Sequence, residues 1–284
     1  MVDSGAAVDV IREIVELKAR RLSWARPVGL VPTMGSLHSG HIELVRRARE
    51  ASATVVASIF VNPTQFGPSE DFERYPRAFE RDLQLLVSAG TDVVFAPSRA
   101  EMYPSGFSSW VQVEEISEPL EGASRPGHFC GVATVCNKLF NIVDPDVAYF
   151  GQKDAQQLAV IRKMIRDLDM NLQVVAVSTV REPDGLALSS RNAYLDPKQR
   201  LAAVVLFRAL QAAREMRRNG CGDAAALTRR MVDVIEAEPL AQLDYAAIVD
   251  PRSFRPIESF HFPALAVLAV RFGATRLIDN LLLE

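Results

Sequence analysis

The chain of 284 residues contains few cysteines, no surplus of basic residues and no long apolar run. Cys130, Cys136 and Cys221 are too few for a disulfide framework and form no Cys-x-x-Cys pair, so we expect a protein of the reducing cytoplasm without a structural zinc site. With a formal net charge of −3, the chain lacks an extended basic face for DNA or RNA. No apolar run is longer than 264–270, which is too short to span a bilayer. Neither a nucleic acid nor a membrane is therefore an expected partner.

No secretory signal is expected at the N-terminus. Residues 1–7 lead into an amphipathic stretch, 9–23, which predicts a helix with charged residues and not the apolar core of a signal peptide. Apolar residues make up 49% of the chain and charged residues 24%, which is typical of a soluble globular protein longer than one average domain. Two domains are the natural expectation.

Short apolar stretches alternate with amphipathic ones from residue 9 to about residue 178. The amphipathic stretches predict helices at 9–23, 41–51, 78–89, 131–143 and 154–168, and the apolar ones predict strands at 28–31, 54–60, 92–95, 147–150 and 172–177. This alternation is typical of an α/β fold, here a Rossmann-like, doubly wound parallel sheet with helices on both faces. In such sheets ligands bind at the carboxyl ends of the strands.

The pattern changes after residue 180. Two helices are predicted at 197–218 and 223–236, followed by strands at 244–249, 264–271 and 275–282. Helices followed by consecutive strands indicate a smaller α+β domain with an antiparallel sheet. We therefore expect a Rossmann-like domain over 1–179 and a C-terminal α+β domain over 180–284 that acts as a lid.

The stretch from Pro32 to His41 lies between a predicted strand and a predicted helix and contains two of the four histidines of the chain. Gly35 and Gly40 allow a tight turn and the close approach of a ligand, and unpaired N–H groups at the helix start would favour an anion. This arrangement predicts a phosphate site flanked by His38 and His41. The alternative is an ordinary turn followed by two surface histidines.

A polar segment bracketed by prolines follows the predicted strand 54–60. It runs from Gly67 to Arg77 and has the composition of a mobile surface loop. A loop of this length could fold over a site and exclude water from a reactive intermediate. An ordinary exposed connection is the alternative interpretation.

A second polar motif follows the predicted strand 147–150. Gly151 permits close approach to a ribose or base, Lys153 supplies a point charge for phosphate, and Asp154 can accept hydrogen bonds from ribose hydroxyls. Gln157 lies about one helical turn after Asp154 and shares its helix face. An ordinary capped helix start explains Asp154, but not Gly151 together with Lys153.

A third motif, Ser189-Ser190-Arg191, closes the alternating part of the chain. Two hydroxyl groups and a guanidinium in succession are donors suited to the β- and γ-phosphates of a nucleotide. Considered alone, the same residues also suit a plain polar loop. The functional interpretation therefore depends on the other motifs.

The turn from Pro32 to His41 resembles the signature of the pantothenate synthetase family, Pro-Thr-Met-Gly-x-Leu-His-x-Gly-His, within the nucleotidylyltransferase superfamily. Residues 125–132 are similar to its Arg-Pro-Gly-His-Phe-x-Gly-Val segment, and Leu188 to Asn192 are similar to its Met-Ser-Ser-Arg-Asn segment. Leucine in place of methionine keeps volume and apolarity, so no change of chemistry is expected. The resemblance covers nearly the whole chain, although its specific motifs lie between Pro32 and Asn192.

The resemblance implies a cytoplasmic, homodimeric ligase that uses ATP and Mg²⁺ to join (R)-pantoate to β-alanine through pantoyl adenylate. It implies a gate loop at 67–77 and three sets of site residues. The catalytic set is His38, His41, Lys153, Ser189 and Arg191. The pantoate set is Met34, Asn62, Gln65, Arg125 and Gln157. The ATP set is Pro32, Thr33, Met34, Gly35, His38, Gly40, His41, Gly151, Lys153, Asp154, Val180, Leu188, Ser189, Ser190 and Arg191.

Two alternatives remain open from the residues alone. An enzyme of the same superfamily that acts on a phosphate acceptor would need an additional cationic pocket, whereas the acceptor-side candidates Gln65 and Gln157 are neutral. A nucleotide-binding module without catalysis would not need the histidine pair and residues 189–191 on one triphosphate. No carboxylate ligand for Mg²⁺ stands out, and phosphate oxygens could hold the ion.

Overall fold

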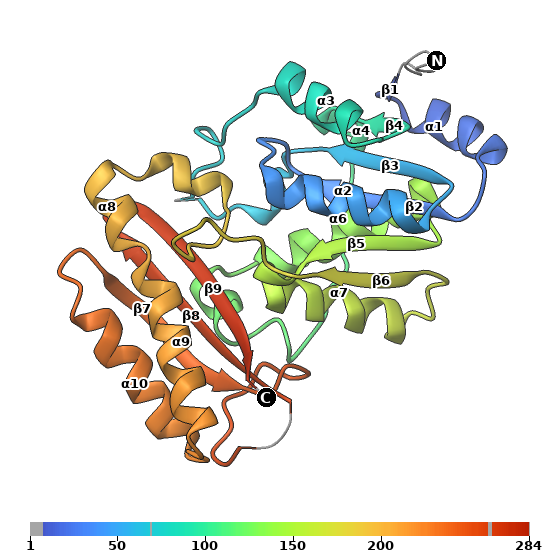
Figure 1. Ribbon diagram of the computed structural model, residues 1–284. Helices are drawn as coiled ribbons and strands as arrows, with labels where there is room; N and C mark the ends of the chain where they lie inside the picture. The colour runs from blue at the N-terminus through green and yellow to red at the C-terminus, as the bar shows by residue number, and fades with distance from the viewer. Residues whose placement is uncertain (1–7, 69, 261–262, 284) are drawn as a thin grey trace. The chain divides into compact units, whose positions relative to one another are not determined.

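The computed structural model describes residues 8–68, 70–260 and 263–283 (Figure 1). The N-terminal stretch 1–7, where no secretory signal is expected, lies outside the described residues. The chain divides into two compact units. The first unit runs to Glu114 and also contains Gly122–Gln152 and Val160–Val177, whereas the second contains Glu115–Glu121, Lys153–Ala159 and Ser178–Glu284.

The first unit is built on a six-stranded parallel sheet with the strand order β1-β4-β3-β2-β5-β6. From β2 the chain adds β3 on one side and later β5 on the other, so the direction of winding reverses between β2 and β5. Ligands of doubly wound sheets bind outside the carboxyl ends of the strands at such a switch point. The strands are β1 (Asp9–Ile11), β2 (Val28–Thr33), β3 (Thr54–Ile59), β4 (Val93–Phe95), β5 (Val147–Gly151) and β6 (Gln173–Val177).

Helices connect these strands and cover the sheet. Leu44, Val45 and Ala48 of α2 and Leu86 of α3 pack with strand residues such as Val31 in one buried cluster, while α6 lies on the other face (Figure 1). Burial on both faces explains why the strands are almost continuously apolar. The helices and short 3₁₀ turns of this region are α1 (Ile14–Arg20), η1 (Arg21–Ser23), α2 (Ser39–Ala51), η2 (Pro63–Gln65), α3 (Phe79–Ser88), α4 (Arg99–Met102), α5 (Glu121–Ser124), α6 (His128–Val143), η3 (Gln152–Asp154) and α7 (Ala155–Asp167).

The second unit contains a three-stranded antiparallel sheet with the order β7-β8-β9. Two helices, α9 and α10, cover one face of this sheet (Figure 1), and their buried residues form one core with it, including Leu210, Met231 and Leu268. The elements are η4 (Ser190–Tyr194), α8 (Pro197–Ala202), α9 (Val205–Arg218), α10 (Ala224–Glu236), β7 (Gln242–Val249), β8 (Ala264–Phe272) and β9 (Thr275–Leu283).

The predicted fold class is confirmed, but three element predictions are corrected. The predicted helix 9–23 is wrong at its start, because Asp9–Ile11 form a strand paired with β4 and the helix begins only at Ile14. The helix predicted at 131–143 begins earlier, at His128, after Gly127 adopts a φ of 83°. The helix predicted at 197–218 is two helices, α8 and α9.

Candidate active site

The turn after β2 places two histidine rings side by side at the start of α2. Nδ1 of His38 accepts a hydrogen bond from the N–H group of Gly40 at 3.2 Å, and Nδ1 of His41 accepts one from the N–H group of His38 at 3.3 Å. The ring centroids are 4.1 Å apart. An imidazole that accepts at Nδ1 carries its proton at Nε2 when it is neutral. Both rings therefore have an Nε2–H donor on the side away from the helix cap.

The expectation of unpaired N–H groups at this helix start is wrong for two of them. Gly40 donates to the ring of His38, and the N–H group of His41 donates to the carbonyl of His38 at 2.9 Å. Together the two side chains form a capping box, so the histidines satisfy backbone N–H groups that have no partner within the helix. Donors for an anion at this turn are therefore the imidazoles, and not these backbone amides.

Asp82 of α3 supports the same turn and was not predicted from the sequence. Its carboxylate, 1% exposed, accepts hydrogen bonds from the N–H groups of Ser36 at 2.7 Å and Leu37 at 2.8 Å. Gly35, with a φ of 78°, approaches so closely that an added Cβ would lie 3.0 Å from this carboxylate. Asp82 thus fixes the backbone directly before His38.

Thr33, predicted to bind ATP, has its hydroxyl engaged in the fold. The hydroxyl donates to the carbonyl of Ser58 at 2.7 Å and accepts from the N–H group of Gly35 at 3.2 Å. It therefore links the end of β2 to β3 and to the turn. Pro32 precedes it as the fifth residue of β2.

Three of the predicted pantoate residues lie together in the first unit. The Asn62 side-chain amide donates to Oε1 of Gln65 at 3.1 Å, and Nε2 of Gln65 lies 2.8 Å from Sδ of Met34. Asn62 and Gln65 are 1% and 9% exposed, so both amides are held in a fixed orientation inside the protein. The structure therefore brings Met34, Asn62 and Gln65 into one cluster.

Residues to which the sequence analysis assigned no role hold this cluster. The Tyr103 hydroxyl donates a hydrogen bond to Oδ1 of Asn62 at 2.9 Å. Burial raises the pKa of Tyr103 above its ordinary value, although the hydrogen bond with Thr64 acts in the opposite direction. The backbone of Gly131 in α6 approaches η2 so closely that an added Cβ would lie 2.3 Å from the carbonyl oxygen of Thr64. The carbonyl of Gly131 accepts from Asn62 at 3.1 Å. A glycine with a close backbone neighbour has no signal in a single sequence.

Arg125, also predicted to bind pantoate, is paired with the loop 67–77. Its guanidinium contacts both carboxylate oxygens of Glu70, at 2.6 and 2.7 Å, and lies 3.0 Å from Nε2 of His128. His128 is 8% exposed, and its Nδ1 lies 2.8 Å from the carbonyl oxygen of Gln65. Arg125 and His128 therefore connect the loop, η2 and the start of α6.

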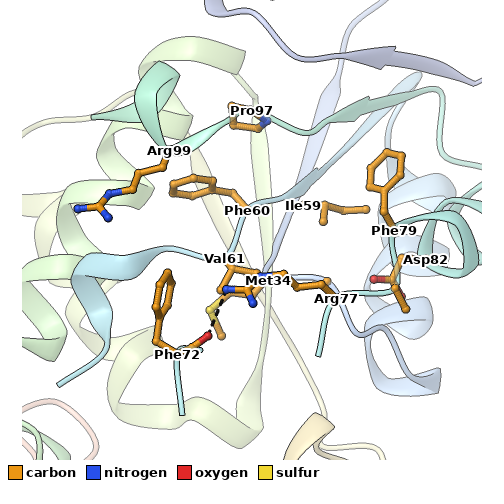
Figure 2. Close-up of a pocket in the computed structure, with 12 residues that line it drawn as sticks. Met34, Ile59, Phe60, Val61, Phe72, Arg77, Phe79, Asp82, Pro97 and Arg99 are labelled. Atoms are coloured by element: carbon orange, nitrogen blue, oxygen red, sulfur yellow. Dashed lines mark hydrogen bonds between the residues drawn. The ribbon is translucent and has the colours of Figure 1, made fainter. Parts of the chain in front are cut away.

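The loop 67–77, of which all but position 69 is described, forms part of a cavity wall beside the histidine turn. Phe72 and Arg77 line a cavity of about 320 Å³ together with Met34, Gly35 and Phe60 (Figure 2). Tyr75 is 6% exposed, and Phe66 makes edge contacts with the rings of Phe72 and Tyr75. The loop is thus held by aromatic packing and by the ion pair of Glu70.

In the second unit, Lys153 and Ser189 face the same small space. Both line a cavity of about 10 Å³ together with Asn192 and Asp279, which is room for about one water molecule. Nζ of Lys153 lies 3.5 Å from Oδ1 of Asp154. The cavity brings together members of two predicted ATP segments that are distant in the sequence.

The segments around these residues have defined conformations. Ser189 caps η4 through a bond from the N–H group of Arg191 at 3.3 Å, and the N–H group of Leu188 donates to the carbonyl of Val180 at 3.0 Å. Ser190 is the first residue of η4. In the first unit, a Cβ at Gly151 would meet no atom within 4 Å, so the backbone there is open to a neighbour.

Gln157 lies half-buried on the first turns of α7, and its neighbour Gln156 holds that helix. Nε2 of Gln156 donates to the carbonyls of Ile116 at 2.9 Å and Pro119 at 2.8 Å, and its Oε1 accepts from the N–H group of Glu121 at 3.1 Å. Gln156 was not predicted as a functional residue. Its bonds fix the orientation of the turn that carries Gln157.

Two further findings concern features that the described residues lack. Among residues 8–68, 70–260 and 263–283, no group of three or more His, Cys, Asp or Glu side chains is placed to hold a metal ion. In the same described part of the chain, no helix is both long and apolar enough to cross a bilayer.

A doubly wound parallel sheet with polar motifs after β2, β3 and β5 is typical of α/β enzymes that bind their ligands at the carboxyl ends of the strands. Within that class, the chain belongs to the pantoate-beta-alanine ligase family, whose model matches residues 8–282. It is therefore an enzyme of the ligase class.

Relatives and solved structures agree with this assignment. The chain is 57% identical to the pantothenate synthetase of Heliobacterium modesticaldum over 277 residues, which cover 98% of this chain and 99% of that protein. It is 58% identical to the pantothenate synthetase of Roseiflexus castenholzii, and the match covers 97% of this chain and 99% of that protein. The crystal structure of pantothenate synthetase from Thermus thermophilus matches with a TM-score of 0.93 at 51% identity, covering 96% of this chain and 99% of that one. That of pantoate-beta-alanine ligase from Francisella tularensis, complexed with beta-gamma ATP and beta-alanine, matches with a TM-score of 0.81 at 34% identity, covering 97% and 98%.

Proposed function

We propose that the protein joins (R)-pantoate to β-alanine at the expense of ATP, through a pantoyl-adenylate intermediate, and releases pantothenate, AMP and pyrophosphate. Membership of the family supports this reaction, and the related Francisella enzyme was crystallised with an ATP compound and β-alanine. The observation that carries the proposal is the pair of histidine rings, each accepting at Nδ1 and so able to donate from Nε2.

In the first step, a carboxylate oxygen of pantoate attacks the α-phosphorus of ATP in line. The bond between the α-phosphorus and the bridging oxygen breaks, and pyrophosphate leaves with the electron pair. In the second step, the unprotonated amine of β-alanine attacks the acyl carbon and the bond from that carbon to the phosphate oxygen breaks. AMP leaves with the electron pair, and the nitrogen loses one proton to the solvent. Neither step needs a protein nucleophile.

Charge that develops on the departing pyrophosphate calls for positioned donors. His38 and His41 supply Nε2–H groups, and Lys153 and Arg191 supply positive charge. Ser189 and Ser190 would donate from their hydroxyls. Donors that are already in place stabilise the transition state without reorganising.

The remaining ATP contacts are proposed for backbone and small residues near these donors. Gly35, Gly40 and Gly151 would allow the nucleotide to approach the chain, and Asp154 would accept hydrogen bonds from the ribose. The engaged hydroxyl of Thr33 leaves its backbone as the proposed contact. The other proposed contacts are Pro32, Met34, Val180 and Leu188.

Met34, Asn62 and Gln65 form the proposed pantoate site, together with Gln157. A neutral amide holds a carboxylate less tightly than a bidentate arginine does, so the acceptor remains nucleophilic. Arg125 is also proposed to bind pantoate, and its pairing with Glu70 supports a contribution to loop closure.

Mg²⁺ is proposed as a partner of the ATP phosphates. The described residues offer no cluster of carboxylates that would form a cage for it, but Mg²⁺ commonly binds through substrate phosphates, waters and one or two carboxylates. When bound, the ion would neutralise charge on the pyrophosphate.

Three further points are proposed from the family resemblance and from the pattern of the sequence. We propose that the enzyme is a homodimer and that it works in the cytoplasm. We also keep 1–179 and 180–284 as its Rossmann-like and lid domains. Gel filtration with light scattering would test the oligomeric state.

A pyrophosphate-release assay separates this function from its alternatives. We expect ATP-dependent release only when pantoate is present, and pantothenate when β-alanine is added. Release with a phosphate-bearing acceptor but not with pantoate would favour a nucleotidyltransferase. ATP binding without release under any condition would favour a binding module.

A further inference from the structure

Strand β9 carries two buried polar residues within an otherwise mainly apolar sequence. Asp279 is 2% exposed and Asn280 is 5% exposed, between Ile278 and Leu281. Burial of a charged group without a partner costs several kcal/mol, so these side chains must have specific contacts. The contacts lead to two separate segments of the second unit.

Asn280 is attached to the Lys153 segment. Its side-chain amide donates to the backbone carbonyl of Lys153 at 2.8 Å. This bond fixes the backbone from which the Lys153 ammonium extends. Lys153 and Asn280 are 127 residues apart in the chain, so nothing local supplies this constraint.

Asp279 is attached to the segment that leads to Ser189. Its carboxylate binds the Arg181 guanidinium with two bonds, at 2.6 and 2.9 Å, and Arg181 in turn donates to the carbonyl of Gly185 at 3.0 Å. The guanidinium also lies over the ring of Phe207, with its central carbon 4.5 Å from the ring centroid. Arg181 and Ala187 form a bridge, so the whole turn before Ser189 is fixed to β9.

The two attachments lie on neighbouring residues and meet at one cavity. Lys153, Ser189 and Asp279 line the same space of about 10 Å³. A buried ion pair contributes little net stability compared with an apolar pair of the same volume, so stability alone does not account for Asp279. Burial raises the pKa of Asp279 above its ordinary value, against the opposing effect of Arg181.

We propose that Asp279 and Asn280 are positioning residues that set the distance between Lys153 and the Ser189–Arg191 segment. Neither residue would touch ATP. Both act through Lys153 and the Ser189–Arg191 segment, which the proposed function assigns to the phosphates of ATP, and the inference rests on that function. A donor displaced by about 1 Å can reduce the rate by up to about 100-fold. Loss of either attachment should therefore affect ATP use selectively.

The test compares Asn280→Leu with Val267→Ala. Leucine has a similar shape but no donor, whereas Val267 pairs in register with Asn280 and lacks any polar side-chain atom. Asn280→Ala serves as a milder second variant if Asn280→Leu folds poorly, and Asp279→Asn tests the other attachment. For each variant we would measure thermal unfolding, pyrophosphate release, and conversion of purified pantoyl adenylate with β-alanine.

We expect the Asn280 and Asp279 variants to lower pyrophosphate release about 10- to 100-fold with a raised KM for ATP. Adenylate conversion should change less than about twofold, and Val267→Ala should lose thermal stability without the ATP effect. Equal losses in both half-reactions, or an effect matched by Val267→Ala, would overturn the positioning role.

Calorimetry with a non-hydrolysable ATP analogue separates this inference from the proposed function. If the wild-type protein bound the analogue but released no pyrophosphate with pantoate, the function would be wrong. Weaker analogue binding by Asn280→Leu than by Val267→Ala would still support the positioning role, and equal binding would overturn it.

Discussion

The carboxylate of Asp82 accepts a hydrogen bond from the backbone N–H group of Ser36 at 2.7 Å, although the two residues are 46 positions apart. It accepts a second from Leu37 at 2.8 Å. The helix α3, which follows the loop 67–77, therefore fixes the turn that leads to the histidine pair. Asp82 is buried, and its removal would leave two backbone N–H groups without their side-chain acceptor.

We expect Asp82→Ala to lower the free energy of unfolding by about 2 to 6 kcal/mol, because the buried N–H group of Leu37 and the half-buried one of Ser36 lose their acceptor at about 1 to 3 kcal/mol each. Adenylation should fall as well, since the position of His38 depends on this turn. Asp82→Asn, which keeps one acceptor oxygen, should lose less of both. Denaturant unfolding and pyrophosphate release measure the two effects, and an Asp82→Ala protein as stable as the wild type would contradict the account.

His41→Ala should lose most of the adenylation activity, by about 3 kcal/mol of transition-state stabilisation, as for removal of one positioned donor. The loss should be much smaller in the second half-reaction, where pyrophosphate has already left. The measurement compares pyrophosphate release from ATP and pantoate with pantothenate formation from purified pantoyl adenylate. If both fell equally, His41 would not be a donor to the leaving group.

Glu70→Gln should weaken the ion pair that connects the loop 67–77 to Arg125. A loop that opens more often would let pantoyl adenylate escape to water, so more pyrophosphate should form per pantothenate. Glu73→Gln is the matched control, because it makes the same change at an exposed position of the same loop. The ratio of the two products is the measurement. An unchanged ratio at a reduced rate would mean that the loop only assists binding.

Gln157→Ala should raise the apparent KM for pantoate, with some loss of kcat through poorer alignment, while ATP affinity measured without pantoate stays nearly constant. The reason is that an uncharged amide suits the reacting carboxylate, and α7 fixes where this amide lies. Gln173→Ala, at an exposed position of β6, serves as a control. Equal losses of ATP and pantoate affinity would instead assign Gln157 to the nucleotide.

Periodicity predicted the fold class because the strands of the parallel sheet are buried on both faces and read as apolar runs. It failed at β1, where Asp9–Ile11 are only three residues long and run into an amphipathic helix. Pairing of this strand with β4 depends on contacts far along the chain, which local pattern does not contain.

The structure brings predicted residues together where they belong to one local motif, as in the turn with His38 and His41. Supporting residues were missed because their contacts are distant in sequence: Asp82 acts on Ser36, and Asn280 acts on Lys153. In the same way, the pair of Arg125 with Glu70 joins residues 55 positions apart. A single sequence shows such residues as ordinary helix, strand or loop positions.

Pantoate labelled with ¹⁸O in its carboxylate tests the adenylate route most directly. If a carboxylate oxygen attacks the α-phosphorus and the amine later displaces AMP, one labelled oxygen must remain on that phosphorus. We therefore predict AMP that carries one ¹⁸O from the labelled carboxylate, with unlabelled pyrophosphate, by mass spectrometry. Unlabelled AMP, or label recovered in inorganic phosphate alongside ADP, would contradict the proposed mechanism.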